Sequence, residues 1–401
     1  MPSRPSAELL DRYARILVDF ALGGGTGISR GDVVMVSASD DAKPFYVAIR
    51  DAVLRSGGTV IGDYHPSGAG RSALELASVE QLATFHRAYY RGLAATVDHR
   101  VSILSTSDPR ELDGVDPEKL FAGRRTIRPY REWIARKEAV GRYTWTLAAF
   151  GTPAMAKEAG LTLAVYWAEI AKACFLEDPD PIRRWRETFR EIGRVKRRLD
   201  GLAIETLHVE GDGVDIRFKV GADRRWLGGT GRNIPSFEIF TTPDWRGTEG
   251  TVTFTEPLHR YGNLIDGIRL RFERGRVVEA AAKRNEGLLQ AMIASDEGAS
   301  RVGEISLTDG RLSPITRYMG ETLFDENRGG PEGNFHLAVG NAYREAFRGD
   351  IAAQSRRDWQ RLGFNESSVH TDIVSTARRT VTVTLPTRRS KVIYADGRFL
   401  V

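Results

Sequence analysis

The chain contains almost no cysteine and no long apolar run. Cys174 is the single cysteine among 401 residues, so no disulfide can form within the chain, and a reducing compartment fits this composition. No apolar stretch is long enough to cross a bilayer. The N-terminal segment places Asp11 and Asp19 in an amphipathic helical pattern instead of an export signal. We therefore expect a cytoplasmic protein without a membrane partner.

The sequence also lacks the phosphate-binding fingerprint of nucleotide enzymes. Its glycine-rich stretch GGGTGISRG, residues 23–31, precedes the first expected strand. A nucleotide motif must instead follow a strand and open a helix, because the helix N-terminus binds the phosphate. We interpret this stretch as an entry loop and assign no nucleotide site to it.

Acidic residues are slightly outnumbered by basic ones, which gives a net charge of +5. Two basic runs, residues 124–137 and 182–198, carry much of the excess. Four glutamates interrupt these runs at helical spacing: Glu132, Glu138, Glu187 and Glu191. Such spacing is typical of solvated or subunit-facing helices. We therefore expect no nucleic-acid partner. The alternative, a nucleic-acid module, would bind DNA or RNA through these helices in a strongly salt-dependent way.

The first part of the chain alternates strand and helix patterns. Apolar strand patterns at residues 33–36, 59–64 and 99–108 are separated by helical patterns, which predicts a parallel sheet with crossover helices. We expect a Rossmann-like sheet within about residues 1–120 and mostly helices over residues 121–200. Together these form a predicted N-terminal α/β domain with a helical extension, residues 1–200.

The second part of the chain has a different pattern from about residue 205. Six stretches alternate apolar and polar residues: ETLHVEG, GVDIRFKV, GTVTFTEP, GIRLRFERGRVVEAAA, TVTVTLP and KVIYADGRFLV. Period-two alternation is typical of half-buried antiparallel strands. The predicted fold class is therefore α/β, with a Rossmann-like N-terminal domain and a β-rich α+β C-terminal domain over residues 201–401.

Two glutamates lie inside apolar, strand-like sequence. Glu238 lies between Phe237 and Ile239, and Glu304 follows Val302 in VGEISL. Burying an uncompensated carboxylate is costly, and a metal ion would compensate it. Both residues are therefore candidate metal ligands.

Two histidine-containing segments follow. His370 and Asp372 form an H-x-D pair whose side chains share one face of an extended chain, so they can bind one ion together or Asp372 can orient the imidazole. His336 follows a glycine-rich loop. Tyr343 lies seven residues further on, about two turns if the segment is helical. We interpret the remaining histidines as surface or packing residues: His65, His86, His99, His208 and His259.

Five blocks in this order resemble the aminopeptidase T family of dimetal exopeptidases. They are NIPSFEIFTTP, GTVTFTEP, SDEGASRVGEISL, TLFDEN with NFHLAVGNAY, and NESSVHTDIV, within residues 233–375. The resemblance implies six metal ligands: Glu238, Glu304, His336, Tyr343, His370 and Asp372. It also implies a cytoplasmic homodimer with an enclosed cavity that removes N-terminal amino acids from peptides.

Three features depart from the family pattern. Phe237 stands where the family usually has glycine, RGGPEG is inserted after the DEN loop, and HTDIVSTARRT replaces the more usual HxDFMIGS. These departures lie near the predicted ligands, so they bear on substrate preference and on the shape of the cavity.

The resemblance implies a metal-dependent aminopeptidase with two divalent ions, zinc, cobalt or manganese, that share a bridging water. Glu304 is the candidate bridging ligand or general base, and Tyr343 is the candidate for oxyanion stabilisation as well as ligation. The ions would lower the pKa of the water and polarise the scissile carbonyl.

Two other functions remain open at this point. A mononuclear Fe(II) dioxygenase of the 2,5-dihydroxypyridine type would use His336, His370 and Asp372 as a two-histidine, one-carboxylate triad. Such an enzyme does not need Glu238 and Glu304 together. A binding or assembly protein without catalysis is a third possibility, against which the complete ligand set argues.

Overall fold

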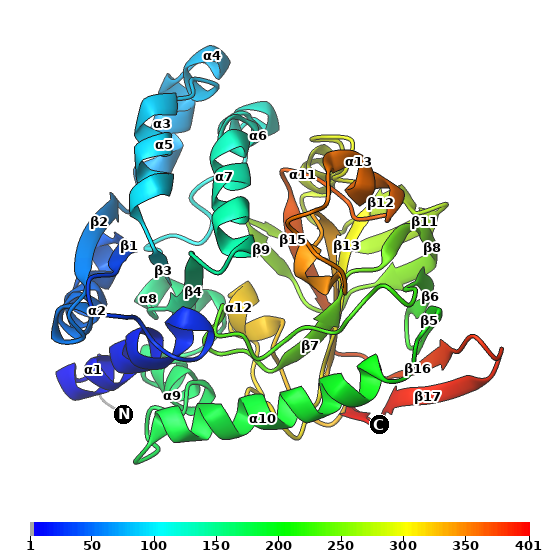
Figure 1. Cartoon of the computed structure of the whole chain (residues 1–401). Coiled ribbons are helices and arrows are strands. Elements are labelled where there is room, and N and C mark those ends of the chain that lie inside the picture. The colour runs from blue at the N-terminus through cyan, green and yellow to red at the C-terminus, as the bar shows by residue number, and fades with distance from the viewer. Residues whose placement is uncertain (1–3) are drawn as a thin grey trace.

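The computed structural model describes residues 4–401, except for the side chain of Arg124, and its first part is built on a parallel sheet (Figure 1). The four strands are hydrogen-bonded in the order β2-β1-β3-β4. They are β1 (Val33–Ser39), β2 (Thr59–His65), β3 (His99–Leu104) and β4 (Thr144–Ala149). The helices of this part are α1 (Ala7–Ile16), α2 (Lys43–Arg55), α3 (Gly70–Leu76), α4 (Val79–Leu82), α5 (Arg87–Thr96), α6 (Pro117–Thr126), α7 (Arg128–Ala139), α8 (Pro153–Glu158), α9 (Leu163–Ala173) and α10 (Pro181–Asp200).

Residues 121–200 are mostly helical, as expected, but they also contain strand β4, which corrects the expectation that the sheet lies within about residues 1–120. Strand β4 pairs with β3 in parallel and completes the sheet, so the sheet extends beyond residue 120. Its sequence, TWTLAA, contains aromatic and β-branched residues that favour strands. The run is only six residues long and lies among strongly helical segments, which hides its periodicity.

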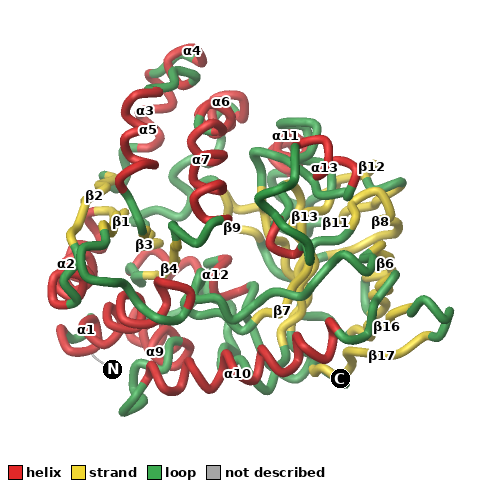
Figure 2. Tube along the Cα trace, viewed as in Figure 1, coloured by secondary structure: helices red, strands yellow, loops and turns green. Residues whose placement is uncertain are grey.

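The second part of the chain is rich in strands (Figure 2), and these strands pair in antiparallel fashion. One sheet has eight strands in the order β12-β11-β8-β6-β5-β16-β17-β18. They are β5 (Thr206–Gly211), β6 (Val214–Lys219), β8 (Asp244–Thr253), β11 (Arg269–Glu273), β12 (Arg276–Ala281), β16 (Arg379–Thr384), β17 (Ser390–Ala395) and β18 (Arg398–Phe399). All six alternating stretches of the sequence contribute to this sheet, and the predicted α/β fold with a β-rich second part is confirmed.

A second, four-stranded sheet lies inside this part, in the order β15-β14-β13-β7. Its strands are β7 (Glu238–Thr241), β13 (Val302–Thr308), β14 (Asn334–Gly340) and β15 (His370–Ser375). A short hairpin, β9 (Leu258–Arg260) and β10 (Asn263–Ile265), and the helices α11 (Glu286–Ile293), α12 (Thr322–Asp325) and α13 (Arg356–Arg361) complete it.

The four-stranded sheet is apolar on one face and polar on the other. The apolar face joins the hydrophobic core of the second part through Ile239, Ile305, Leu307, Phe335, Leu337, Val339 and Ile373. Side chains alternate along a strand, so the residues between them project to the opposite face. That opposite face carries Glu238, Glu304, His336, His370 and Asp372, and it defines the candidate site described below.

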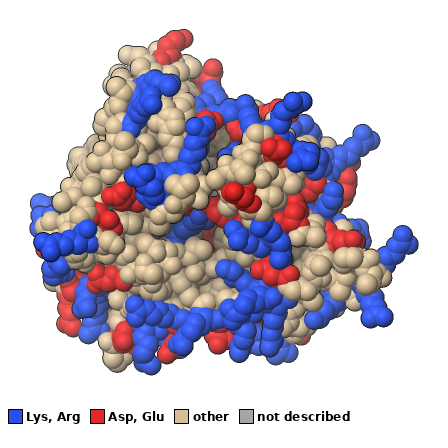
Figure 3. Space-filling view, in the orientation of Figure 1, with Lys and Arg blue, Asp and Glu red and all other residues tan. Residues whose placement is uncertain are grey.

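Helix α10 connects the two parts and packs against both cores. Trp185 belongs to the core of the parallel sheet, whereas Ile192, Val195 and Leu199 belong to the core of the antiparallel sheets. The helix lies along the lower edge in Figure 1, where basic side chains line the surface in Figure 3. The division into domains at residue 200 stays a prediction, because the helix that ends there belongs to both cores.

The arginines of α10 are solvated, as the sequence predicts. Three ion pairs form within the helix, Arg183–Glu187, Arg184–Glu187 and Arg194–Glu191. Exposed pairs of this kind contribute only about 0.3–0.5 kcal/mol each.

Within residues 4–401, no helix is long and apolar enough to cross a membrane.

Phe237, which replaces the usual glycine of the family pattern, does not enter the candidate site. Its side chain is fully buried, and its ring lies 5.3 Å from that of Trp185 and 5.9 Å from that of Phe175. Phe237 precedes β7 and belongs to the hydrophobic core of the parallel-sheet part. The substitution therefore fills that core.

We predict that Phe237→Ala lowers the free energy of unfolding by about 3–5 kcal/mol, because it removes a buried ring from a packed aromatic cluster. Urea denaturation followed by tryptophan fluorescence measures the change. Val140→Ala is the control, since Val140 is 60% exposed and its truncation costs less than about 0.5 kcal/mol. Equal effects of the two substitutions would contradict the packing role of Phe237.

Candidate metal centre

Five candidate ligands lie on neighbouring strands of one sheet. Glu238 opens β7, Glu304 lies on β13, His336 lies on β14, and His370 and Asp372 lie on β15. In the register of the sheet, Ser306 on the central strand β13 lies opposite His336, and Ala338 lies opposite both Glu304 and Asp372. Neighbouring strands of a sheet lie about 4.8 Å apart. Residues as far apart in the chain as Glu238 and Asp372 therefore converge on one face.

A β-bulge directs Glu304 into the site. The register of β13 against β14 shifts between Val302 and Glu304, so Gly303 is the extra residue. Bulges beside functional sites re-aim the side chain that follows. A Cβ atom at Gly303 would lie 2.2 Å from the carbonyl oxygen of Asn341, so only glycine fits this close approach.

The ligand atoms form two groups that share Glu304. One group contains Glu238, Glu304 and His336, and the other contains Glu304, His370 and Asp372; within each, the ligand atoms lie within 4.8 Å of one another. The Nε2 atom of His336 is 3.3 Å from Glu238 Oε2 and 3.4 Å from Glu304 Oε1. The Nε2 atom of His370 is 3.5 Å from Glu304 Oε2 and 3.5 Å from Asp372 Oδ1.

These distances suit ligands of a common ion better than hydrogen-bonded partners. A good N–H···O bond is about 2.9 Å long. Two ligands that each lie about 2.1 Å from a tetrahedral ion are about 3.4 Å apart. Each imidazole therefore stands at the separation from its carboxylates that a shared metal ion would produce.

The hydrogen bond of His370 agrees with this fit. The Nδ1 atom of His370 lies 2.8 Å from the carbonyl oxygen of Asn341, which orients the imidazole and leaves Nε2 free to bind an ion. The Nδ1 atom of His336 is buried and has no hydrogen-bond partner among the described residues. The donor set of carboxylate oxygens and imidazole nitrogens suits zinc, cobalt or manganese.

The electrostatics of the site couple its acids to its imidazoles. Burial raises the pKa of the Glu304 carboxyl to about 7, although the neighbouring imidazole of His336 acts to lower it. Burial lowers the pKa of the His370 imidazole, but the negative charge of Asp372 has the larger effect, and the pKa is raised to about 9. The pKa of His336 is likewise raised well above its usual value, because Glu238 and Glu304 outweigh burial. The carboxylates thus require positive partners, either protonated imidazoles or a metal ion.

Tyr343 lies beside these groups. The segment between His336 and Tyr343 is not a helix, however, so the two residues are not brought together by helical turns. The segment after His336 is strand β14, and Tyr343 follows the end of that strand. Its ring contacts that of His370 edge-on, with centroids 5.0 Å apart. Burial raises the pKa of Tyr343 well above its usual value, and Glu304 adds to the rise. Burial therefore favours the neutral form of the phenol.

Sequence reasoning missed Arg232 as a member of this site. The guanidinium of Arg232 lies over the ring of Tyr343, 5.7 Å from its centroid, and over that of Trp145 at 5.6 Å. It donates to Glu138 at 2.7 Å and to Glu345 at 2.5 Å. An isolated arginine in a loop carries no local signal, and only the fold brings it to Tyr343.

Asp325 and Glu326 are neighbours in the chain, but their side chains have different surroundings. Asp325 does cap the loop, because it accepts hydrogen bonds from the backbone N–H groups of Met319 at 2.7 Å and Glu321 at 3.0 Å. Glu326 is buried, and its pKa is raised well above the usual value by burial and then by Glu238. It is thus a further acid in the field of the candidate ligands.

The inserted segment RGGPEG, residues 328–333, packs away from the ligands. Glu332 accepts hydrogen bonds through its carbonyl oxygen from Tyr394 at 3.3 Å and Arg379 at 3.2 Å, both in the eight-stranded sheet. Arg328 pairs with Glu256 at 2.6 Å. The insertion therefore supports the C-terminal hairpin and does not line the group of ligands.

The remaining histidines do not join the site. Among the described residues, none of them belongs to a group that could hold a metal ion. His99 is buried between Asp32 and Thr144, at 2.9 and 2.7 Å, whereas His208 pairs with Asp215 on the sheet surface at 2.8 Å. These contacts fit the packing and surface roles expected for them.

Comparison with known families gives a match over nearly the whole chain. Residues 6–399 match the family model described as thermophilic metalloprotease (M29). The chain is 31% identical to aminopeptidase T of Thermus thermophilus over 389 residues, which covers 91% of this chain and 92% of that protein. The family resemblance drawn from the five sequence blocks is confirmed.

Two further relatives and a solved structure agree with this match. Aminopeptidase AmpS of Bacillus subtilis is 26% identical and aminopeptidase PepS of Streptococcus thermophilus is 27% identical, each over 92% of both chains. The structure of wild-type AmpT from Thermus thermophilus superposes with a TM-score of 0.81 at 27% identity. That superposition covers 98% of this chain and 99% of the other.

We predict that metal binding to the site releases protons at neutral pH. His370, with its pKa raised to about 9, is protonated at pH 7 and must lose its proton before Nε2 can bind an ion. The affinity for Zn²⁺ should therefore rise with pH by about tenfold per unit for each proton released. Calorimetric titration in buffers of different ionisation enthalpy counts the protons. Binding with no proton release at pH 7 would contradict this assignment.

Proposed function

The chain belongs to the M29 family of metalloproteases, and we propose that it is a metal-dependent aminopeptidase that acts through a water bridging two divalent ions. The relatives that it matches over more than nine-tenths of its length are aminopeptidases by name. Its substrates would be peptides with a free N-terminus. We further propose a cytoplasmic homodimer, as the resemblance implies.

One observation carries the two-ion proposal: the two groups of ligands share Glu304. The two oxygens of its carboxylate face different imidazoles, with Oε1 toward His336 and Oε2 toward His370. A carboxylate in this position can bridge two ions, each completed by the outer carboxylate of its group, Glu238 or Asp372. When bound, the ions would lower the pKa of a shared water and polarise the scissile carbonyl.

Glu304 and Tyr343 would carry the proton transfer and the charge stabilisation. Glu304 would bridge the ions or accept the proton of the attacking water, and a carboxyl with a pKa near neutrality is suited to both accept and return a proton. Tyr343 would bind an ion through its phenol oxygen, or it would donate its hydroxyl hydrogen to the oxyanion of the tetrahedral intermediate. Arg232, which lies over the ring of Tyr343, would favour negative charge at that position.

The geometry supports this function over a mononuclear iron dioxygenase. That alternative needs His336, His370 and Asp372 on a single ion. Among the described residues, His336 and His370 fall into different groups, and each group contains a glutamate. The positions of Glu238 and Glu304 are then explained by two ions and unexplained by one.

We predict close to two ions per chain after reconstitution with Zn²⁺, Co²⁺ or Mn²⁺, and hydrolysis of amino-acid p-nitroanilides that requires a free α-amine. Metal analysis and a panel of free and N-acetylated substrates measure both. One iron per chain, no hydrolysis and oxygen uptake with a dihydroxypyridine would overturn the proposal in favour of ring cleavage.

We also predict that Glu304→Gln lowers kcat by at least about 100-fold, because an amide can neither accept a proton nor bridge two cations. The fold should persist, since glutamine keeps the volume of the side chain. Glu169→Gln is the matched control: Glu169 is buried as well, but it pairs with Lys172 and Arg317 away from the ligands. Unchanged turnover in Glu304→Gln would remove Glu304 from the mechanism.

A further inference from the structure

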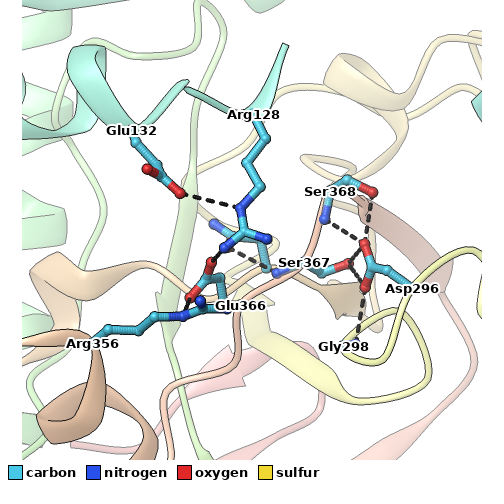
Figure 4. Close-up of polar contacts among 9 residues, drawn as sticks. Arg128, Glu132, Asp296, Gly298, Arg356, Glu366, Ser367 and Ser368 are labelled. Atoms are coloured by element: carbon cyan, nitrogen blue, oxygen red, sulfur yellow. Dashed lines mark hydrogen bonds and ion pairs between the residues drawn. The ribbon is translucent and has the colours of Figure 1, made fainter. Parts of the chain in front are cut away.

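The loop before His370 is held by a carboxylate that the mechanism does not use. Asp296 accepts hydrogen bonds from the backbone N–H of Ser368 at 2.7 Å and from its hydroxyl at 2.6 Å (Figure 4). It also accepts from the hydroxyl of Ser367 at 2.8 Å and from the backbone N–H of Gly298 at 2.9 Å. Four donors on one half-buried carboxylate fix both the loop and the turn that carries Asp296.

His370 needs such support more than the other ligands do. It is the first residue of β15, which lies at the edge of the four-stranded sheet. Its side chain is 25% exposed, whereas that of His336, on the inner strand β14, is 1% exposed. Packing alone therefore holds His336 in place, but the position of His370 depends on the loop that precedes it.

The contacts continue from this loop to the imidazole. The carbonyl oxygen of Val369 accepts from the backbone N–H of Asn341 at 2.7 Å, and the carbonyl oxygen of Asn341 in turn accepts from His370 at 2.8 Å. Asn365, at the other end of the loop, donates to the carbonyl oxygen of Gly298 at 2.7 Å. Loop, turn and imidazole thus form one hydrogen-bonded unit with Asp296 at its centre.

The loop has two further sets of contacts, one half-buried and one exposed. Arg131 of α7 donates to the carbonyl oxygen of Ser368 at 2.8 Å. Glu366 pairs with Arg128 and Arg356, whose side chains are 49% and 65% exposed. Exposed ion pairs are screened by solvent and hold a loop weakly. The carboxylate of Asp296, with four hydrogen bonds, is the main restraint.

We propose that Asp296 is a positioning residue that directs His370 toward Glu304 and Asp372, and that it thereby sets the affinity of one of the two metal sites. The inference rests on the proposed function, because it assumes that the group of Glu304, His370 and Asp372 binds an ion. The group of Glu238, Glu304 and His336 contains no residue of this loop and should not depend on Asp296.

Asp296→Asn tests the proposal in the full-length chain. The backbone N–H groups of Gly298 and Ser368 donate to different oxygens of Asp296, so an asparagine in either orientation turns its NH₂ group toward one of them. Zn²⁺ is titrated into metal-stripped protein in competition with a chelator. We expect the affinity for one of the two ions to fall by about 10- to 100-fold while the other is unchanged.

Asp309→Asn is the matched control. Asp309 is also a buried acceptor of several hydrogen bonds, from Arg311 at 2.9 Å and from the backbone N–H of Phe399 at 3.0 Å, but it contacts no residue of the loop. Its substitution should leave both affinities and the turnover unchanged. An equal loss of Zn²⁺ affinity in Asp309→Asn would overturn the specific role of Asp296.

Replacing Ser367 and Ser368 together by alanine gives a second test that does not alter Asp296. The loss should again be confined to one ion, and in the combined variant it should be less than the sum of the separate losses, because both changes weaken the same contact between the loop and residue 296. Two unchanged affinities in these variants, with two ions bound to the unmodified chain, would overturn this inference alone. An unmodified chain that binds no Zn²⁺ would overturn the proposed function as well.

Discussion

Three carboxylates and two imidazoles share one face of a buried sheet, and this concentration of charge is the constraint on which the rest of the site depends. A buried carboxylate without a partner is costly, and a neighbouring carboxylate makes the cost greater. Glu304 is 3% exposed and lies between the two imidazoles, so its charge is compatible with the fold only where they, or ions between them, compensate it. The surrounding structure has to hold five groups at the separations that permit this compensation.

The sheet meets that requirement by separating its two faces. Its apolar face is part of a large core, so the strands cannot shift in register without exposing that core. The same register places Glu304 and His336 on the polar face. His370, at the start of an edge strand, lacks this support, and the hydrogen bonds of its loop replace it.

The sequence predicts those parts of the site whose geometry is local. The H-x-D spacing places His370 and Asp372 on one face of a strand, and the structure has them there. Glu238 and Glu304 were identifiable because a carboxylate in an apolar strand requires compensation. Non-local partners carried no such signal: Arg232 reaches Tyr343 only through the fold. Strand β4 and the direction of Phe237 were likewise decided by packing against other elements, which a local pattern does not contain.

The α/β part of the chain also takes part in the site. Helix α7 contributes Glu138, which binds Arg232 over the ring of Tyr343, and Arg131, which binds the loop before His370. Tyr343 and His370 are half-buried, whereas Glu304 and His336 are fully buried on the inner strands of the four-stranded sheet. The two parts therefore hold different members of the site: the sheet core fixes the inner ligands, and α7 restrains the groups that face outward.

Because Glu138 and Glu345 share one guanidinium, separating the parts would leave Arg232 without one of its two carboxylates beside Tyr343. The position of that phenol thus depends on contacts between the two parts, and the α/β part belongs to the site.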